Sequence, residues 1–284
     1  MIPFTKAHAC GNDFLIVTEE AADGYDKSEL AQRLCERNTS IGADGVEFFA
    51  WTGDSSARIQ LYNADGSIAE ISGNGTRCVA AFMADELNSV EGDTLTVETD
   101  AGIRTCTIRD FRKHENDGPS ILVTTDMDIP DFEQRTIELA DGSEIQGAVV
   151  SMGNPHFVIL LGDMIADGPN FFLNGRSWEE IGEEICFHPD FPDQTNVEFI
   201  RIMNSASSKL DHVQIRIYER GVGPTTSSGT GTSATAVAMI AFHEAETTLE
   251  VAAPGGMQTV EWAGPGEKLY LTGPATLIAC GEAW

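Results

Sequence analysis

The feature that most constrains the fold of this sequence is that four short segments occur twice, in the same order. Three of the pairs are β-rich: residues 11–17 resemble 153–159, residues 46–49 resemble 197–200, and residues 59–62 resemble 215–218. The fourth is a Ser-Gly-X-Gly motif, which begins ten residues after Tyr62 and again ten residues after Tyr218. One short match arises easily by chance, but four ordered matches do not. The chain is therefore predicted to be a duplicated unit.

Each Ser-Gly-X-Gly motif, beginning at Ser72 or Ser228, leads into an apolar, alanine-rich stretch. These stretches, residues 78–87 and 234–245, have the length and composition of buried helices. Each half is thus predicted to run strand, turn, strand, Ser-Gly-X-Gly, buried helix. Because copies of a duplicated unit normally pack with pseudo-twofold symmetry, we expect the two motifs to face a shared cleft. Turn signals between short strand candidates, such as Asp141-Gly142, favour a mixed α+β fold over a doubly wound sheet.

Composition and charge restrict the class of protein. With 284 residues, 42% of them hydrophobic, the chain can bury one large core or two of ordinary size. A formal net charge of −28 would repel a phosphate backbone, which argues against nucleic acid as a partner. The acidity leaves two explanations open, an ordinary solvated surface or adaptation to high salt. No apolar run is long enough to span a bilayer and no signal peptide is evident, so a soluble cytoplasmic protein without a membrane partner is expected.

The cysteines give no sign of a metal site or a disulfide framework. They are scattered, with no CxxC pair and no histidine cluster at metal-ligand spacing. We expect reduced thiols that mostly fill the core, at positions Cys10, Cys35, Cys78, Cys106, Cys186 and Cys280.

The glycine motifs are predicted to bind anions. A helix that begins immediately after glycines exposes backbone N–H groups, and its dipole places partial positive charge there. Neither motif has the lysine of a P-loop or the full dinucleotide fingerprint, so a small carboxylate is a better ligand than a nucleotide. A single GxG is weak evidence, because a tight turn also needs glycine. Its occurrence at equivalent positions in both halves is what favours the binding function.

Polar residues beside these motifs and at strand ends are candidates for ligand contacts, because loops often carry function. An asparagine in a turn can also serve only its own backbone, and Glu219 with Arg220 could form an exposed ion pair of little value. At the mouth of an anion-binding turn, Arg220 could instead clamp a carboxylate while Glu219 accepts an ammonium group. The candidates are Asn12, Asn63, Asn154, Asn196, Glu219 and Arg220.

Taken together, these motifs resemble the diaminopimelate epimerase family of cofactor-independent amino-acid epimerases and racemases, over nearly the whole chain. The resemblance rests on seven segments in the family's order: residues 11–14 (GNDF), 42–45 (GADG), 63–67 (NADGS), 73–78 (GNGTRC), 152–156 (MGNPH), 219–221 (ERG) and 229–231 (GTG).

The resemblance implies an α+β fold of two pseudo-symmetric halves, each a curved, mostly antiparallel sheet around a central helix, with the active site in the cleft between them. The first half is expected to cover residues 1–120, joined by a C-terminal strand at 272–284, and the second residues 121–271. The implied reaction interconverts LL- and meso-diaminopimelate, in the pathway to lysine and peptidoglycan precursors, without cofactor or metal. A small amino-acid substrate is the implied partner, and a homodimer is left open.

Site residues follow from the same resemblance. Substrate contacts are implied for Asn12, Asn63, Asn154, Asn196, Glu219 and Arg220. Backbone N–H groups of Gly73, Asn74, Gly229 and Thr230 would hold the reacting carboxylate, and His156 and Glu219 match positions that assist the catalytic pair.

The sequence departs from the family at the two positions that carry the chemistry. Family members have a cysteine before each glycine motif, where one thiolate removes the α-proton and the opposite thiol protonates the other face. Here these positions are Ser72 and Ser228. A thiol starts from a pKa of about 8.5 and is readily ionised at a helix N-terminus, whereas a serine hydroxyl is far too weak an acid to serve as a base unaided. The nearest thiol in sequence, Cys78, is expected to lie inside the helix.

Three explanations of the serines remain open. They could have been introduced into a true epimerase to trap its substrate. They could be native, in an epimerase that uses serine or in a same-fold isomerase or dehydratase of another small amino or carboxylic acid. They could also mark a non-catalytic protein that binds a small ligand.

Overall fold

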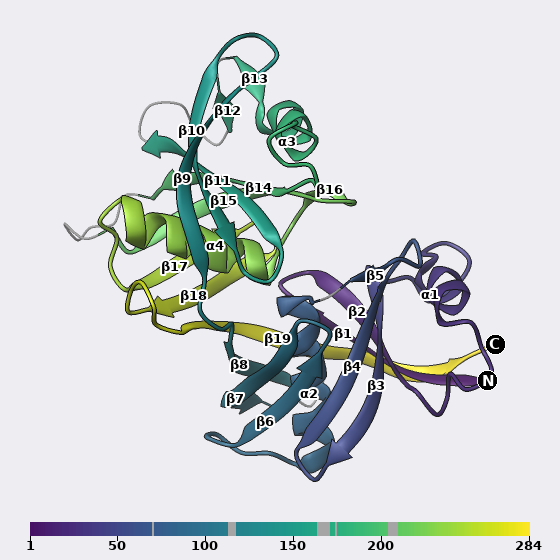
Figure 1. Cartoon of the computed structure of the whole chain (residues 1–284). Helices are drawn as coiled ribbons and strands as arrows, with labels where there is room; N and C mark the ends of the chain where they lie inside the picture. Colours follow the sequence, from purple (N-terminus) through teal and green to yellow (C-terminus); the bar gives the residue numbers. More distant parts are fainter. Residues whose placement is uncertain (70, 113–117, 164–170, 174, 204–209) are drawn as a thin grey trace. The chain divides into compact units, whose positions relative to one another are not determined.

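The computed structural model describes residues 1–69, 71–112, 118–163, 171–173, 175–203 and 210–284. It is dominated by β-sheet, with barrel-like units and few helices (Figure 1). Two compact units divide the chain, the first formed by Met1–Asp126 with Thr272–Trp284 and the second by Met127–Leu271. The sequence had placed this division at residue 120 rather than 126.

The first unit contains two helices within the described residues, and most of its strands form a closed ring. Its elements are β1 (Ile2–Ala9), β2 (Asn12–Thr18), α1 (Lys27–Cys35), β3 (Gly45–Gly53), β4 (Ser56–Asn63), β5 (Ile68–Ala69), α2 (Gly73–Leu87), β6 (Thr94–Thr99), β7 (Gly102–Arg112), β8 (Ser120–Asp126) and most of β19 (Leu269–Ala283). Antiparallel pairs join β6, β7, β8, β19, β1 and β2 in turn. From there β2 runs parallel to β3, β3 is antiparallel to β4, and β4 runs parallel to β6, which closes the ring.

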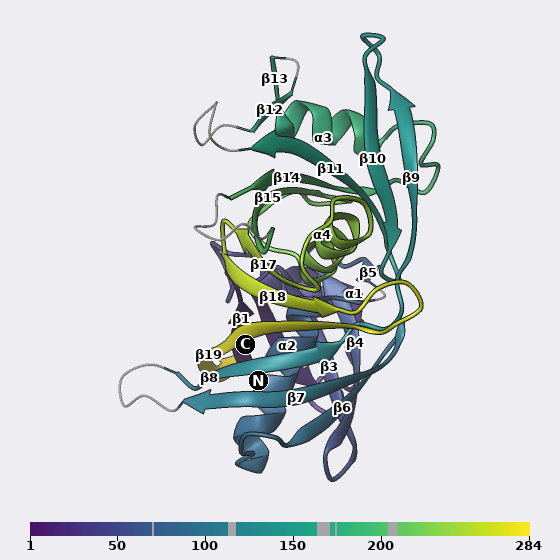
Figure 2. The same cartoon turned by 90° about the vertical axis from the view of Figure 1, so that its left-hand side faces the viewer.

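Helix α2 is the core of this ring. It packs against β1, β2, β6, β7 and β8 (Figure 2), and every residue from Gly73 to Ala81 is buried. Its buried residues include Gly73, Gly75, Cys78, Ala80 and Ala81, whose small side chains let the surrounding strands approach closely. The shorter helix α1 packs on β3 and β4 and covers a second apolar cluster.

The second unit repeats this order of elements within its described residues. They are β9 (Asp131–Glu138), β10 (Glu144–Ser151), β11 (Pro155–Asp163), β12 (Phe172–Leu173), β13 (Arg176–Ser177), α3 (Trp178–Cys186), β14 (Asn196–Ile202), β15 (His212–Glu219), β16 (Gly223–Thr225), α4 (Gly229–Phe242), β17 (Thr248–Ala253) and β18 (Gly256–Trp262). Strands β9, β10 and β11 are antiparallel, β11 runs parallel to β14, and β14 is antiparallel to β15. Strand β15 then runs parallel to β17, which is antiparallel to β18.

Helix α4 occupies the place in this unit that α2 has in the first. It packs against β10, β11, β14, β17 and β18, and it is apolar or small on all sides, as a helix surrounded by sheet must be. Both central helices start earlier than predicted, at Gly73 rather than 78 and at Gly229 rather than 234. The glycines are therefore part of the first helical turn, because the serine before each motif caps the helix.

Two further sequence expectations concern cysteines and membrane segments. Five cysteines are buried, Cys280 is exposed, and all six are free thiols. Cys78 lies within α2, and burial raises its pKa well above the usual value, so it is no substitute for a catalytic thiolate. Within the described ranges, no helix is long and apolar enough to cross a membrane.

Candidate active site

The first glycine turn is built on Ser72, the N-cap of α2. Its backbone is extended, at φ −127° and ψ 120°, and its Oγ accepts a hydrogen bond of 3.0 Å from the backbone N–H of Gly75. This is the usual serine cap, which satisfies one of the N–H groups that a helix start leaves without an internal partner. The preceding N–H groups, on Gly73 and Asn74, are those expected to hold an anion.

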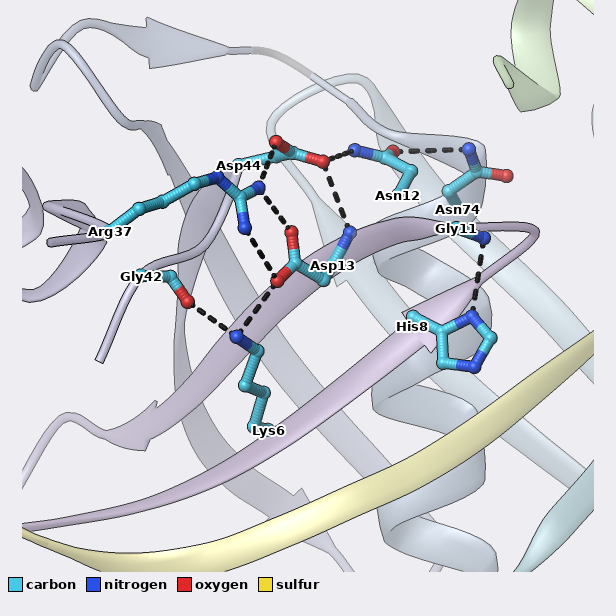
Figure 3. A network of polar contacts seen from close by, with 9 residues as sticks. All are labelled: Lys6, His8, Gly11, Asn12, Asp13, Arg37, Gly42, Asp44 and Asn74. Atoms are coloured by element: carbon cyan, nitrogen blue, oxygen red, sulfur yellow. Dashed lines mark hydrogen bonds and ion pairs between the residues drawn. The ribbon is translucent and has the colours of Figure 1, made fainter. Parts of the chain in front are cut away.

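Asn12 and Asn74 meet directly beside this turn. Asn74 Nδ2 donates a hydrogen bond of 3.1 Å to Asn12 Oδ1 (Figure 3), and Asn12 Nδ2 donates one of 2.6 Å to Asp44 Oδ2. Asn74 Oδ1 accepts from the buried Arg77 guanidinium at 2.5 Å. Both amides are therefore fixed in orientation, which the sequence alone did not show.

A charged network holds Asn12 in place from the other side. Arg37 contacts Asp13 and Asp44 at 2.7 Å each, and Lys6 contacts Asp13 at 2.9 Å (Figure 3). Burial alone would raise the pKa of Asp13, but the hydrogen bonds from Arg37 and Lys6 outweigh it and lower that pKa. Asp13 therefore stays ionised at neutral pH. This network was missed, because nothing in the local sequence links Lys6 and Arg37 to the Asn12 turn.

Asn63 lies at the end of β4, in a turn that neighbours Asp44. Its Nδ2 donates to Ser67 Oγ at 3.0 Å and its backbone N–H to Ser67 O at 2.8 Å. The N–H of the next residue, Ala64, donates to Asp44 O at 3.0 Å. The first unit thus brings Asn12, Asn74 and the Asn63 turn around one loop.

Behind the first turn lies Glu47, a carboxyl that the sequence analysis did not single out. It is fully buried on β3, and a Cβ added to Gly75 would come within 2.0 Å of its Oε1. Only glycine allows the helix to approach this carboxyl so closely. Neither oxygen has a hydrogen-bond partner among the described residues, and burial raises the pKa of Glu47 to about 8.

The second glycine turn has the same backbone arrangement. Ser228 is the N-cap of α4, and its Oγ accepts from Gly231 N at 3.1 Å. The same oxygen lies 3.3 Å from Thr230 Oγ1, and Asn154 Nδ2 donates to that hydroxyl at 3.4 Å. Three of the predicted residues of the second half, Ser228, Thr230 and Asn154, are thus joined in one chain of polar contacts.

His156 continues this chain into the core. Its Nε2 lies 2.9 Å from Asn154 Oδ1 and its Nδ1 lies 2.8 Å from Glu198 Oε1, with His156 and Glu198 both fully buried. An amide oxygen can only accept, so Nε2 carries a proton. A further proton lies between Nδ1 and the carboxylate. His156 and Glu198 together can hold a proton, but the Asn154 side chain lies between them and the hydroxyls of Thr230 and Ser228.

Asn196 and Arg220 form the remaining contact of the second half-site. Arg220 N donates to Asn196 Oδ1 at 2.9 Å, and Asn196 Nδ2 donates to Pro155 O at 2.9 Å. The exposed guanidinium of Arg220 donates to Asp193 O at 3.1 Å. Glu219 is the last residue of β15, directly before Arg220. Among the described residues, no group of His, Cys, Asp or Glu side chains could hold a metal ion.

Comparison with known proteins places this geometry in a family. The family model of diaminopimelate epimerase matches residues 4–127 and 148–278, which include every residue of both half-sites. The chain belongs to the diaminopimelate epimerase family. It is 34% identical to the diaminopimelate epimerase of Pseudomonas savastanoi pv. phaseolicola over 288 residues, which cover 99% of each chain. It is also 34% identical to diaminopimelate epimerase 1 of a Nostoc species, over 300 residues and again 99% of each chain.

A solved structure outside the epimerase proper shares the fold. A probable proline racemase from Agrobacterium radiobacter superposes with a TM-score of 0.67 at 15% identity, covering 99% of this chain and 92% of that one. At this identity the likeness concerns the fold alone. In this chain, the caps of both glycine turns are serine oxygens.

Proposed function

We propose that this chain is an amino-acid isomerase of the diaminopimelate epimerase type, with LL- and meso-diaminopimelate as its substrates and a two-base α-proton transfer as its reaction. The supporting observation is that each glycine turn keeps its polar surroundings, in a chain that matches diaminopimelate epimerases from end to end. In this proposal both turns act on one substrate molecule, and Ser72 and Ser228 occupy the positions of proton transfer.

Substrate binding is assigned to groups already fixed by the protein. The first helical N–H groups of α2 and α4 would hold the reacting carboxylate, because the N–H groups of a helix start point toward an anion and carry partial positive charge. Asn12, Asn63, Asn154 and Asn196 would orient the polar ends of the substrate. Arg220 would pair with a carboxylate and Glu219 with an ammonium group.

Proton transfer is the weak step of the serine form. In the first half, no hydrogen bond links Glu47 to Ser72, since both Glu47 oxygens are without a partner among the described residues. In the second, the path from His156 to Ser228 runs through the Asn154 amide, which neither gains nor loses a proton at ordinary pH. Among the described residues, neither Glu47 nor His156 therefore contacts the serine of its turn directly, so we expect binding to be retained and turnover to be slow.

The test is the exchange of the substrate α-proton in D₂O, followed by ¹H NMR with LL-diaminopimelate. We expect the Ser72→Cys/Ser228→Cys variant to exchange about 10²- to 10⁴-fold faster than the serine form, the range for a positioned proton-transfer group. The two single-cysteine variants are the matched controls, because each restores only one of the two bases. No exchange by any cysteine form, with folded protein, would refute the assigned reaction.

A second candidate function is a binding protein without turnover. It is suggested by the same observation, that neither Glu47 nor His156 contacts the serine of its turn directly. It predicts diaminopimelate affinity in the serine form together with no detectable exchange, even at long incubation. A same-fold isomerase of another small acid predicts that neither form binds diaminopimelate. Calorimetric titration of the serine form separates these alternatives. For the intact protein we also propose a cytoplasmic location, and sedimentation analysis would establish whether it forms a homodimer.

A further inference from the structure

Glu47 is a buried carboxyl that the proposed reaction does not use. It is the third residue of β3, where its neighbours across the sheet are Ile16 on β2 and Leu61 on β4, both buried and apolar. Its exposed fraction is 0%, and neither oxygen has a hydrogen-bond partner in the part of the chain that the structure describes. A carboxylate without partners is costly in such surroundings, so the neutral acid is the favoured form.

The carboxyl is also placed against the start of α2. Oε1 lies 2.0 Å from the position of a Cβ on Gly75, and the same position is 3.2 Å from Ser72 Cβ. Glu47 is therefore within a few ångströms of the N-cap and the first helical turn. This turn is where the helix dipole carries its partial positive charge.

Glu47 acts electrostatically on Cys78 of α2, as do Arg77, Asp13 and Cys10, so these described residues are titratable or charged groups of the same region. Burial raises the pKa of Glu47 to about 8, and no charged group among the described residues offsets it. The carboxyl is thus neutral at pH 7 and ionises in the mildly alkaline range.

We propose that Glu47 is a protonation-dependent gate on the first glycine turn, which binds a carboxylate while Glu47 is a neutral acid and loses affinity when Glu47 is ionised. The inference rests on the proposed function, from which it takes the substrate carboxylate at this turn. A negative charge behind Gly75 would offset the partial positive charge of the helix start and repel an incoming anion. Glu47 acts through the turn and is a positioning residue.

The equivalent carboxyl of the second unit is arranged differently. Glu198 lies behind Gly231, 2.6 Å from the position of a Cβ there, but it pairs with His156. The strand register puts Phe14 at the position in the first unit that His156 has in the second. A phenyl ring has no nitrogen with which to share a proton, as His156 does with Glu198. The protonation of Glu47 is therefore not coupled to a neighbouring imidazole and follows the pH alone. The gate is a property of the first turn.

The test compares the affinity for meso-diaminopimelate of the wild-type chain and of Glu47→Gln, by isothermal titration calorimetry between pH 6 and pH 9.5. Glutamine keeps the shape of the side chain and cannot ionise. The substrate's own amino groups titrate in the same way in both experiments, so the ratio of the two dissociation constants isolates Glu47. Glu29→Gln, which removes one exposed charge at the start of α1, is the control for net charge.

We expect equal affinities for the wild-type chain and Glu47→Gln at pH 6, and an affinity about 10- to 30-fold weaker for the wild type at pH 9.5, the repulsion expected of two charges several ångströms apart near a protein surface. Glu29→Gln should follow the wild type. A ratio that stays constant with pH overturns the gate, and shows that Glu47 is only structural.

A second ligand separates failure of the gate from failure of the proposed substrate. Malonate carries carboxylates but no amine, and its effect on the Gly73 and Asn74 amide shifts at pH 6.5 shows whether it binds the turn. If diaminopimelate binds neither form, the substrate assignment fails, and the gate is judged by malonate calorimetry over the same pH range. Malonate binding that weakens at alkaline pH only in the wild type supports the gate. Equal pH dependence in both forms, or no binding at the turn, overturns it.

Discussion

The two glycine turns share a backbone and differ in what stands behind them. Each begins with a serine N-cap whose Oγ accepts from the third helical N–H, at 3.0 Å in the first turn and 3.1 Å in the second. Each has a buried glutamate against the glycine at that third position. In the second turn His156 is hydrogen-bonded to Glu198. In the first, Phe14 stands at the equivalent position, and neither oxygen of Glu47 has a hydrogen-bond partner among the described residues.

This difference shows which parts of a duplicated site are fixed by backbone geometry and which by chemistry. A carboxyl can fit behind the helix start in both halves, because only glycine stands between the strand and the helix. The proton on that carboxyl depends on its partner, and the partner is set by one residue on the neighbouring strand. We infer that the halves keep a common anion site while handling protons differently.

The largest effect is expected when the second turn is made like the first. His156→Phe places the residue of the first unit at the equivalent position and removes both hydrogen bonds of the imidazole. Because Glu198 and Asn154 are then left without these partners, we expect the free energy of unfolding to fall by about 3 to 5 kcal/mol. Urea unfolding at pH 7, followed by circular dichroism, measures this.

The control for His156→Phe is the double variant His156→Phe/Glu198→Gln. It removes the carboxyl that the single variant leaves unpaired, so part of the lost stability should return. If His156→Phe were as stable as the wild type, the His156–Glu198 pair would not be what distinguishes the two turns.

The two helices that begin at the glycine turns were predictable from sequence because the repeat itself signalled them. The Ser-Gly-X-Gly motifs predicted two buried helices with polar residues at their starts, and α2 and α4 confirm the helices. Their first residues were wrong by about one turn, because glycine was interpreted as preceding the helix. Serine capping makes the glycines part of it.

The contacts that orient the site were not predictable in the same way. The signal for Glu47 and Glu198 was present, since each is an acidic residue inside an otherwise apolar strand in matched segments. That pattern indicates burial but does not say which carboxyl has a partner, which depends on strand register. The ion pairs of Arg37 with Asp13 and Asp44 depend on how a loop folds back on β2, and no local pattern encodes that.

The buried carboxyl of the first turn should also make stability depend on pH. The pKa of Glu47 is raised to about 8 in the folded chain, from a usual value of 4.5. Between these two pH values the unfolded chain releases the proton that the folded chain keeps, so stability is complete below pH 4.5 and falls as pH rises to about 8. The loss is at most about 1.4 kcal/mol per pH unit.

Glu47→Gln should remove this contribution. We expect its free energy of unfolding, relative to the wild type, to rise by about 2 to 3 kcal/mol between pH 6 and pH 8. Urea unfolding at intermediate pH values tests this, with Glu29→Gln as the control that should show no such trend. A difference between Glu47→Gln and the wild type that does not change with pH would mean that Glu47 is already ionised in the folded chain.

The smallest predicted effect concerns the feature that the two turns share. Ser72→Ala and Ser228→Ala each remove one N-cap hydrogen bond, and each should lower the free energy of unfolding by about 1 kcal/mol. Because the two caps have nearly the same geometry, the losses should be equal, and thermal unfolding of the two variants measures them. A clearly larger loss at Ser228 would mean that its contact with Thr230 also stabilises the fold. Sulfur is a weak acceptor, so the corresponding cysteine variants should lose part of the same stability. Serine at these positions would then favour the helix start, and cysteine the proton transfer.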